Sequence, residues 1–407
     1  MSKVIRNVLA YRDGAWKKTD ILIEGNKIAL VADSINVTID AAGRETSGMQ
    51  TVGDETASGE ANVLTESKLV EEIDGAGMRI IPGYIDQHVH VLGGGGEGSF
   101  ITQVPPLKLS DPPLAGVTTI VGVLGTDGTT RSVKNLVAKT KALKEFGLTA
   151  FCLTGNYMYP SPTLTGNVAD DIVFVEEIIG VKIAICDHRS SNMSVEDLTK
   201  LASDARVAGL LSGKVGEVHL HTGSGKEKLK IIFDVLEKTD IPISVFRPTH
   251  LENKYDEAIK FAKMGGYIDF TCDPDMDWLA STVVKALDEA PEGLVTFSTD
   301  SNGSMPIWNE KKEMIGIEAG KISSLHETIK YMVEKLGCPL EKAIKPVTEN
   351  VAKALNLGDR KGKIAEGFDA DLVILDDELN INTVFAMGKL MVREGKLAVR
   401  VPFEKLA

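Results

Sequence analysis

Residues 81–98 read IPGYIDQHVHVLGGGGEG, and this stretch decides the fold. Its first part is apolar, as is typical of a buried strand, and it ends in His88 and His90 before a run of glycines. Two histidines at positions i and i+2 lie on the same side of a strand, so one metal ion could bind both imidazoles. The alternative is a pair of buried histidines with ordinary hydrogen-bond partners, because the motif alone is not specific.

Apolar, β-branched runs recur downstream of this stretch, and most are followed by a helix-like segment. Eight runs are found, at 80–85, 118–123, 150–153, 181–186, 218–221, 243–246, 268–272 and 295–298. Helical spacing or composition marks 135–145, 196–208, 226–239, 255–263 and 280–288. This alternation predicts an α/β fold, a (β/α)₈ TIM barrel, over residues 80–364.

The two ends of the chain differ from this middle. Short strand-like runs at 4–9, 20–24 and 27–31 have counterparts at 371–375, 383–387 and 389–392. We therefore expect residues 1–79 and 365–407 to form one small β-sandwich domain. Residues 40–67 are rich in Gly, Thr, Ser and Glu without apolar periodicity, which predicts a mobile insertion.

Composition excludes several classes of partner. The chain has 407 residues and a formal net charge of −13, which disfavours nucleic acid and anionic membranes and favours a small-molecule substrate. No apolar stretch is long enough to cross a bilayer. The four cysteines are widely spaced without a CxxC pair, which predicts reduced thiols and a cytoplasmic location.

Polar residues recur where the later strands end. His221 and His250 end or follow the fifth and sixth strands, and Asp300 follows the eighth. In a barrel the carboxyl ends of the strands carry the chemistry, so these side chains and the first histidine pair should converge on one rim. Imidazole and carboxylate ligands without cysteine predict Zn²⁺ or another borderline divalent metal.

Lys182 stands in the apolar run of the fourth strand. A buried ammonium is unfavourable unless it is neutralised or paired. A lysine with a lowered pKa can react with CO₂, and the resulting carbamate could bridge two metals; the alternative is a lysine paired with an acid. Of the other histidines, His188 and His326 are expected in a loop and on a helix, and His219 is expected to lie one layer below the ligands.

Several runs resemble the isoaspartyl dipeptidases of the amidohydrolase superfamily, and the similarity extends over nearly the whole chain. The runs are PGYIDQHVHVLGGGGEG (82–98), LGTDG (124–128), LTGNY (153–157), GVKIAICDHRS (180–190), HLHTG (219–223), PTH (248–250) and STDSNGS (298–304). The resemblance implies hydrolysis of β-aspartyl dipeptides by a hydroxide that bridges two divalent metals, with Zn²⁺ expected. It also implies a large homo-oligomer, an octamer.

The resemblance further implies a role for each matching residue. One metal is held by His88, His90 and Asp300, the other by His221 and His250, and a carboxylated Lys182 bridges the two. Asp300 also serves as general base and acid. The remaining roles are Tyr157 for the oxyanion, Glu97 for the free α-amino group, and Gly95, Thr126, Arg189 and Ser304 for a substrate carboxylate.

The chain departs from the family pattern at Asn253, where the resemblance leads us to expect a second substrate-binding arginine. Lys254 is the next residue. Either this lysine substitutes as a point charge, or the affinity for the substrate carboxylate is reduced at that end. This difference bears on which substrate is preferred, and we expect the hydrolytic chemistry to be unchanged.

Three functions are compatible with these residues. The first is a dipeptidase for β-aspartyl dipeptides, because Glu97 and Arg189 supply partners for an amine and a carboxylate. The second is another amidohydrolase, such as an N-acyl amino acid deacylase or a cyclic amidase resembling dihydroorotase or hydantoinase. The third is a non-catalytic barrel that serves as a binding module, which the complete set of ligand residues disfavours.

Overall fold

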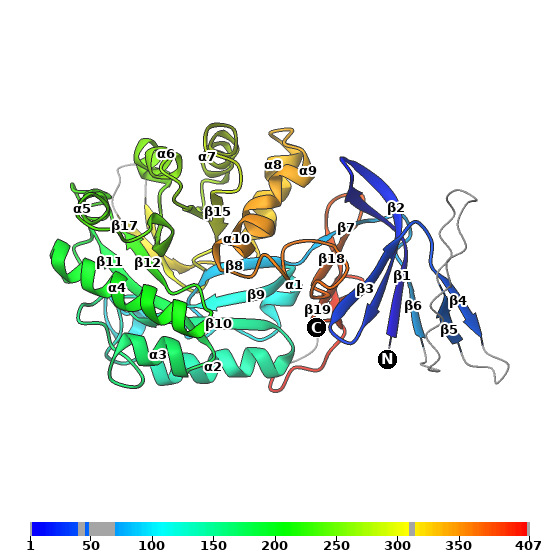
Figure 1. Cartoon of the computed structure of the whole chain (residues 1–407), viewed down its shortest axis with the longest axis horizontal. Coiled ribbons are helices and arrows are strands. Elements are labelled where there is room, and N and C mark those ends of the chain that lie inside the picture. Colours follow the sequence, from blue (N-terminus) through cyan, green and yellow to red (C-terminus); the bar gives the residue numbers. More distant parts are fainter. Residues whose placement is uncertain (1, 40–44, 49–69, 309–313, 405–407) are drawn as a thin grey trace. The chain divides into compact units, whose positions relative to one another are not determined.

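The computed structural model describes residues 2–39, 45–48, 70–308 and 314–404. These residues form two compact units, one of Tyr84–Gly358 and one that joins Met1–Gly83 to Asp359–Ala407. Figure 1 shows the first unit as strands flanked by helices and the second as strands alone. The unit of Tyr84–Gly358 carries all the residues predicted to form the site.

A six-stranded parallel sheet forms the centre of this unit, in the order β13-β12-β11-β10-β9-β8. Its strands are β8 (Tyr84–Val89), β9 (Val117–Gly122), β10 (Thr149–Gly155), β11 (Ile178–Ile185), β12 (Glu217–Thr222) and β13 (Phe246–Thr249). Two further parallel strands, β14 (Ile268–Thr271) and β15 (Val295–Ser298), pair with each other. Every residue of β8, β9 and β11–β15 is buried, as expected for parallel strands covered on both faces.

Helices follow the strands and lie on the outside of the sheet (Figure 1). They are α1 (Asp111–Leu114), α2 (Val133–Phe146), α3 (Val168–Phe174), α4 (Val195–Ser212), α5 (Lys230–Lys238), α6 (Tyr255–Lys263), α7 (Met276–Glu289), α8 (Ser324–Glu334), α9 (Leu340–Ala343) and α10 (Glu349–Ala354). A capping box between Ser194 and Asp197 begins α4, and Gly213 ends it in the left-handed conformation. A hairpin of β16 (Ser304–Trp308) and β17 (Met314–Ala319) follows β15.

Two predicted strands are corrected. The apolar run at 80–85 is two strands: β7 (Arg79–Pro82) belongs to the other unit, and β8 begins after Gly83. A continuous apolar run conceals this break because both strands are buried. The strand predicted at 243–246 begins only at Phe246, because 243–245 form a 3₁₀ turn after Pro242.

The second unit is a nine-stranded mixed sheet built from both ends of the chain. Its strands are β1 (Ser2–Arg12), β2 (Ala15–Glu24), β3 (Lys27–Ala32), β6 (Val70–Asp74), β7, β18 (Leu372–Leu375), β19 (Ile381–Ala386), β20 (Lys389–Arg393) and β21 (Lys396–Leu397). Antiparallel pairing of Ile80 with Ile374 joins the two ends. Buried aliphatic side chains from both ends, such as Ile21 and Leu372, form one core.

Part of the predicted insertion at 40–67 has regular structure. Residues Glu45–Gly48 form β5, which pairs antiparallel with β4 (Asn36–Ile39). The rest of 40–67 lies outside the described residues, so the predicted mobility stays a prediction.

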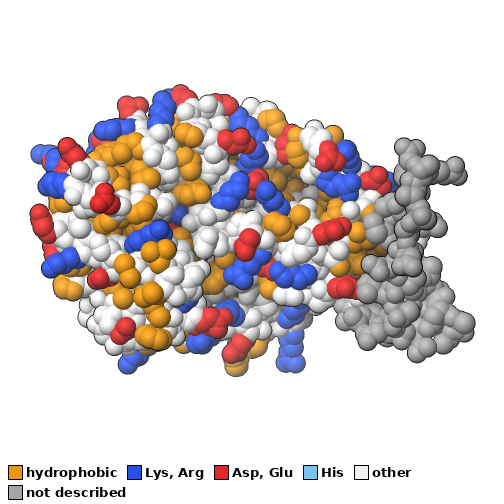
Figure 2. All heavy atoms as spheres, in the orientation of Figure 1, with side chains coloured by type: hydrophobic (Ala, Val, Ile, Leu, Met, Phe, Trp, Pro, Cys, Tyr) orange, Lys and Arg blue, Asp and Glu red, His pale blue; other side chains and the backbone are white. Residues whose placement is uncertain are grey.

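Acidic and basic side chains are interspersed on the face in view, with apolar patches between them (Figure 2). Exposed apolar side chains of α3 and α4 include Phe174, Leu210 and Leu211. Among the described residues, no helix is both long and apolar enough to span a membrane.

Candidate active site

The predicted metal ligands come from the carboxyl-terminal halves of strands and from the residues just after them. His88 lies on β8 and Lys182 on β11, while His221 lies on β12; His250 directly follows β13, and Asp300 follows β15 by two residues. His250 and Asp300 have positive φ values of 60° and 52°. Such a conformation in a non-glycine residue is strained and is found most often at functional sites.

The carboxylate of Asp300 contacts both histidines of the HxH motif, His88 and His90. Its Oδ1 lies 2.9 Å from His90 Nε2 and 3.3 Å from His88 Nε2. Burial alone would raise the pKa of Asp300, but its interactions with His90, His250 and Lys182 outweigh burial and hold the pKa well below its usual range. The carboxylate is therefore ionised at neutral pH.

The same residues fit a divalent cation. Ligand atoms of His88, His250 and Asp300 all lie within 4.8 Å of one another, so these three residues could hold a metal ion. His250 Nε2 is buried without a hydrogen-bond partner, although such atoms are normally satisfied. Burial lowers the pKa of both His88 and His250 well below the usual value, which keeps their imidazoles neutral and able to bind metal.

Lys182 is completely buried next to these ligands. Its Nζ lies 3.1 Å from His88 Nε2, and no carboxylate in the described part of the chain lies within ion-pair distance of it. The alternative of a lysine paired directly with an acid is therefore absent from these residues. Burial lowers the pKa of Lys182 to about 7, so a large share of the amine is neutral at neutral pH.

His221 is held differently from the other histidines. Its Nε2 lies 2.8 Å from Asp187 Oδ2, and its Nδ1 lies 2.7 Å from the Tyr157 hydroxyl. The imidazole of His250 is adjacent, with ring centroids 4.6 Å apart. Both nitrogens of His221 thus have protein partners here, and Nδ1 becomes available to a metal only if Tyr157 turns away.

Asp187 is a site residue that sequence reasoning missed. It accepts hydrogen bonds from Arg189 Nε and Nη2, each at 2.9 Å, as well as contacting His221. Burial opposes its ionisation, but the hydrogen bonds from Arg189 and His221 hold the pKa of Asp187 well below its usual range. A carboxylate that holds one nitrogen of a ligating histidine is a common support of metal sites. The signal in the sequence was its position two residues after the end of β11 and two residues before Arg189.

Glu97 gathers the residues predicted to bind substrate. Its carboxylate accepts hydrogen bonds from Arg189 Nη1 and Thr126 Oγ1, both at 3.1 Å, and from Ser304 Oγ at 3.4 Å. These four side chains line one pocket with His90, Tyr157, His221 and Asp300. Glu97 comes from the glycine-rich loop after β8, so one loop joins this cluster to the histidine pair.

Gly95 also lines this pocket, and its backbone explains the glycine. Its φ is 77°, and a Cβ atom there would lie 2.4 Å from the Thr102 carbonyl oxygen. Any larger residue would displace the loop that carries Glu97.

Asn253 does not line the pocket. It is exposed on the 3₁₀ turn Glu252–Lys254. Lys254 is buried and donates from Nζ to the carbonyl oxygens of Thr222 and His250 at 3.1 and 3.3 Å. Its charge therefore stabilises the backbone at the ends of β12 and β13, and among the described residues that line the pocket Arg189 is the one lysine or arginine.

The remaining histidines lie outside the ligand group. His188 is exposed, and His326 is partly buried on α8, as expected. His219 is fully buried on β12, with its Nε2 3.5 Å from His88 Nδ1. It therefore lies below the ligands, as the sequence predicts.

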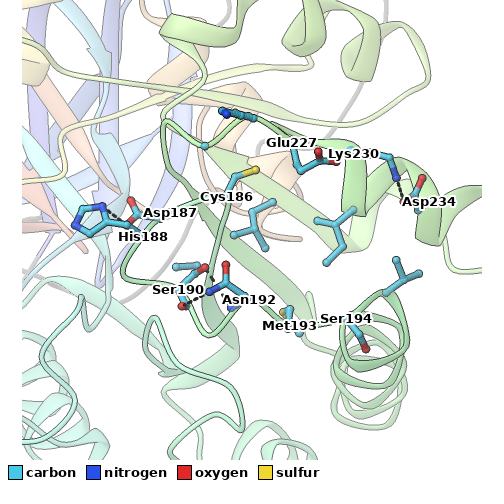
Figure 3. Close-up of a pocket in the computed structure, with 16 residues that line it drawn as sticks. Cys186, Asp187, His188, Ser190, Asn192, Met193, Ser194, Glu227, Lys230 and Asp234 are labelled. Atoms are coloured by element: carbon cyan, nitrogen blue, oxygen red, sulfur yellow. Dashed lines mark hydrogen bonds and ion pairs between the residues drawn. The ribbon is translucent and has the colours of Figure 1, made fainter.

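Asp187 also lines a second pocket, between the loop after β11 and the start of α5 (Figure 3). Cys186, Asn192 and Glu227 contribute to its wall, and Lys230 pairs with Asp234 at 2.6 Å. None of the residues predicted to form the site lines this pocket.

Comparison with known proteins decides the family. The model of the family described as "Amidohydrolase family" matches residues 79–391, which include every residue of the site. The chain belongs to the amidohydrolase family. This amidohydrolase is also 36% identical to a solved structure of β-aspartyl dipeptidase from Fervidobacterium islandicum AW-1, in complex with the dipeptide β-Asp-Leu. The match covers 99% of this chain and 100% of that chain, with a TM-score of 0.85, so the predicted kinship is confirmed.

More distant relatives share the fold. Dihydropyrimidinase from Brevibacillus agri NCHU1002 is 17% identical over 98% of this amidohydrolase and 96% of that chain, with a TM-score of 0.63. N-acetylglucosamine-6-phosphate deacetylase from Bos taurus is 29% identical over 117 residues, which are 25% of this chain and 28% of the deacetylase. The matched part therefore spans less than a third of that curated relative.

Proposed function

We propose that this amidohydrolase hydrolyses β-aspartyl dipeptides in a binuclear metal site. The observation that carries the proposal is the cluster around Glu97, which lies in one pocket with Asp300 and two histidines. A β-aspartyl dipeptide presents a free α-amino group and carboxylates near the amide that is cleaved. Glu97 would bind the amine, while Arg189, Thr126, Ser304 and the Gly95 backbone would bind a carboxylate.

The ligand set we propose follows the resemblance. His88, His90 and Asp300 would hold one ion and His221 and His250 the other, with a carbamate on Lys182 between them; Zn²⁺ suits these donors. When bound, the metals would supply Lewis acidity that polarises the amide carbonyl and acidifies a water. The burial of Lys182 and its lowered pKa support the carbamate, because only the neutral amine reacts with CO₂.

The protein's own groups would carry the proton transfers. Asp300 is ionised and can accept a proton from the attacking water, then return it to the nitrogen of the leaving amine. Tyr157 stays protonated because burial raises its pKa well above the usual value, so it can donate a hydrogen bond to the developing oxyanion. Asp187 would hold His221 in the orientation that points Nδ1 into the site.

We also infer that the two parallel sheets close into an eight-stranded barrel. Val89 bridges to Ser301 in parallel, and His90 N donates to Ser301 O at 2.9 Å. On the opposite edge, Leu251 N approaches Asp269 O at 3.4 Å. We also infer that the nine-stranded sheet folds over its buried aliphatic core to form a β-sandwich.

Two further expectations belong to this proposal. Cys152, Cys186, Cys272 and Cys338 are free, which fits a reducing cytoplasmic location. The family resemblance also leads us to expect a homo-oligomer. Analytical ultracentrifugation would test this expectation by giving the mass of the assembly.

A substrate panel tests the proposal. The metal-loaded protein would be offered β-Asp-Leu, α-Asp-Leu, N-acetyl-leucine, dihydroorotate and hydantoin, with product amines measured. We expect the highest kcat/KM on β-Asp-Leu. Turnover of an acylated or cyclic amide with no activity on β-Asp-Leu would favour a deacylase or cyclic amidase, and a protein that binds no divalent ion would not be an enzyme of this type.

Replacing Glu97 by Gln is expected to lower kcat/KM on β-Asp-Leu by about 10²-fold, because a charged hydrogen bond to the substrate amine is lost. A substrate without that amine, such as N-acetyl-leucine, should be affected little. Gln103, which contacts Asp127 from the same loop, offers a matched control as Gln103→Ala. An equal loss on both substrates would show that Glu97 only supports the loop.

Replacing Tyr157 by Phe is expected to lower kcat by about 10²-fold or more while metal content stays unchanged, as for the loss of one oxyanion donor. Because the pKa of Tyr157 is raised, its ionisation should not produce an alkaline limb in the pH profile of the wild type. Steady-state kinetics with metal analysis checks both points. A loss of metal without a specific loss of kcat would instead place Tyr157 as a support of His221.

A further inference from the structure

A chain of buried polar side chains leads away from His88 into the interior of the sheet. His219 and Glu217 lie on β12 and Arg247 lies on β13, and all three side chains are completely buried. The proposed mechanism assigns no role to any of them. Polar groups at such depth are unfavourable unless they are paired, so their arrangement needs a physical explanation.

Consecutive contacts join these residues to the proposed ligand. His88 Nδ1 lies 3.5 Å from His219 Nε2, His219 Nδ1 lies 3.3 Å from Glu217 Oε1, and Arg247 Nε donates to Glu217 Oε2 at 3.2 Å. The other side of the His88 ring faces the site, because its Nε2 is the atom near Asp300 and Lys182. His88 therefore presents one nitrogen to the metal centre and the other to this chain.

Glu217 decides the direction of the hydrogen bonds. Its carboxylate can only accept, so the nearest nitrogen of His219, Nδ1, must carry the proton and donate. Nε2 of the neutral ring is then a lone pair, and it accepts from His88 Nδ1–H. The opposite tautomer would place a lone pair against the carboxylate. One consistent direction thus runs from His88 through His219 to Glu217.

Arg247 balances the charge at the end of the chain. It pairs with Glu217, donates from Nη2 to the Ala354 carbonyl at 2.8 Å, and lies over the Tyr267 ring at 4.5 Å from the centroid. A buried carboxylate without this partner would be strongly destabilising. The arginine therefore permits an ionised Glu217 directly beneath the proposed metal centre.

Thr249 is the competing partner of His88. Its Oγ1 also lies 3.5 Å from His88 Nδ1, but the hydroxyl donates to Asp269 Oδ2 at 2.9 Å. Its one proton is thus committed to Asp269, but the lone pairs of the hydroxyl can still accept from His88 Nδ1–H. Thr249→Val therefore tests which of the two acceptors, Thr249 or His219, holds the His88 proton.

We propose that His219 and Glu217 are positioning residues for metal binding: they fix the tautomer and ring orientation of His88 and direct its Nε2 lone pair into the site. The inference rests on the proposed metal centre. Support of this kind typically contributes about 10- to 100-fold to metal affinity.

The experiment measures Zn²⁺ affinity of the full-length protein by chelator competition. We expect His219→Phe and Glu217→Gln to weaken binding by about 10- to 100-fold, with His219→Gln intermediate because its amide oxygen can still accept from His88. Thr249→Val should change affinity by less than about threefold. The visible spectrum of the Co²⁺-loaded protein should shift in the His219 variants and stay unchanged in Thr249→Val.

Each outcome bears on a separate claim. A wild type that binds no Zn²⁺ contradicts the proposed metal centre itself. The positioning role is overturned if His219→Phe binds Zn²⁺ as tightly as the wild type does. It is also overturned if Thr249→Val loses more Zn²⁺ affinity than His219→Phe. If the variants do not fold, ¹⁵N spectra of histidine-labelled wild type decide: a protonated His219 Nδ1 supports the inference, and a protonated Nε2 overturns it.

Discussion

Asp300→Asn is expected to lower kcat on β-Asp-Leu by at least about 10³-fold, within the range for a lost general acid–base. The carboxylate of Asp300 is ionised and lies within 3.3 Å of the imidazoles of His88 and His90. An amide in its place cannot accept the proton of the attacking water or return it to the leaving amine. The measurement is single-turnover kinetics on variant protein whose metal content has been determined.

The control for this variant is Asp288→Asn, an acidic residue that pairs with Lys342 on the surface of α7. It should keep wild-type activity. If Asp300→Asn retains two metals and more than a tenth of wild-type kcat, another group carries the proton. If the variant also loses metal, it would be reloaded with metal and its rate measured at several viscosities. A rate that does not change with viscosity reports the chemical step, so a rate that stays low after reloading shows the loss of the base and not only of a metal ligand.

Lys182→Ala should abolish activity, by about 10³-fold or more, because the proposed anion between the metals is lost and both ions are bound more weakly. Small carboxylates such as formate or acetate are expected to restore part of the activity, since they fit the cavity left by the side chain and supply an equivalent anion. Activity and bound metal would be measured against carboxylate concentration.

Lys182→Arg is the matched control, because its guanidinium has a similar size but cannot form a carbamate. It should be inactive, and carboxylates should not rescue it. For the wild type, adding bicarbonate during metal loading should increase activity. This increase should be slower at low pH, because below its pKa of about 7 the Lys182 amine is protonated and cannot react with CO₂. Full activity of Lys182→Arg would contradict the carbamate.

Much of the fold could be predicted from the sequence because buried parallel strands are continuous apolar runs. The strand at 295–298 and the helix at 255–263 coincide with β15 and α6. β13 was predicted three residues early because it contains Arg247 and Pro248, which are unusual in a central strand. Its arginine is tolerated through Glu217 on the neighbouring strand, a pairing that no local pattern reveals.

The site was harder to predict where it depends on partners distant in sequence. The convergence of His88, His90, His250 and Asp300 followed from strand ends alone. Asp187 was missed because its contact with His221 spans 34 positions. Sequence also could not indicate that Lys254 is occupied by backbone carbonyls. Which partners a side chain binds in this way is decided by the tertiary structure.

The pairing of β7 with β18 has a consequence for biosynthesis. Ile80 emerges from the ribosome long before Ile374, so β7 has an open edge while the whole of Tyr84–Gly358 is being made. Contacts this distant in sequence form slowly, and an unpaired strand edge invites association with other chains. We expect nascent chains that stop short of β18 to aggregate or to need a chaperone, even when their catalytic half is complete.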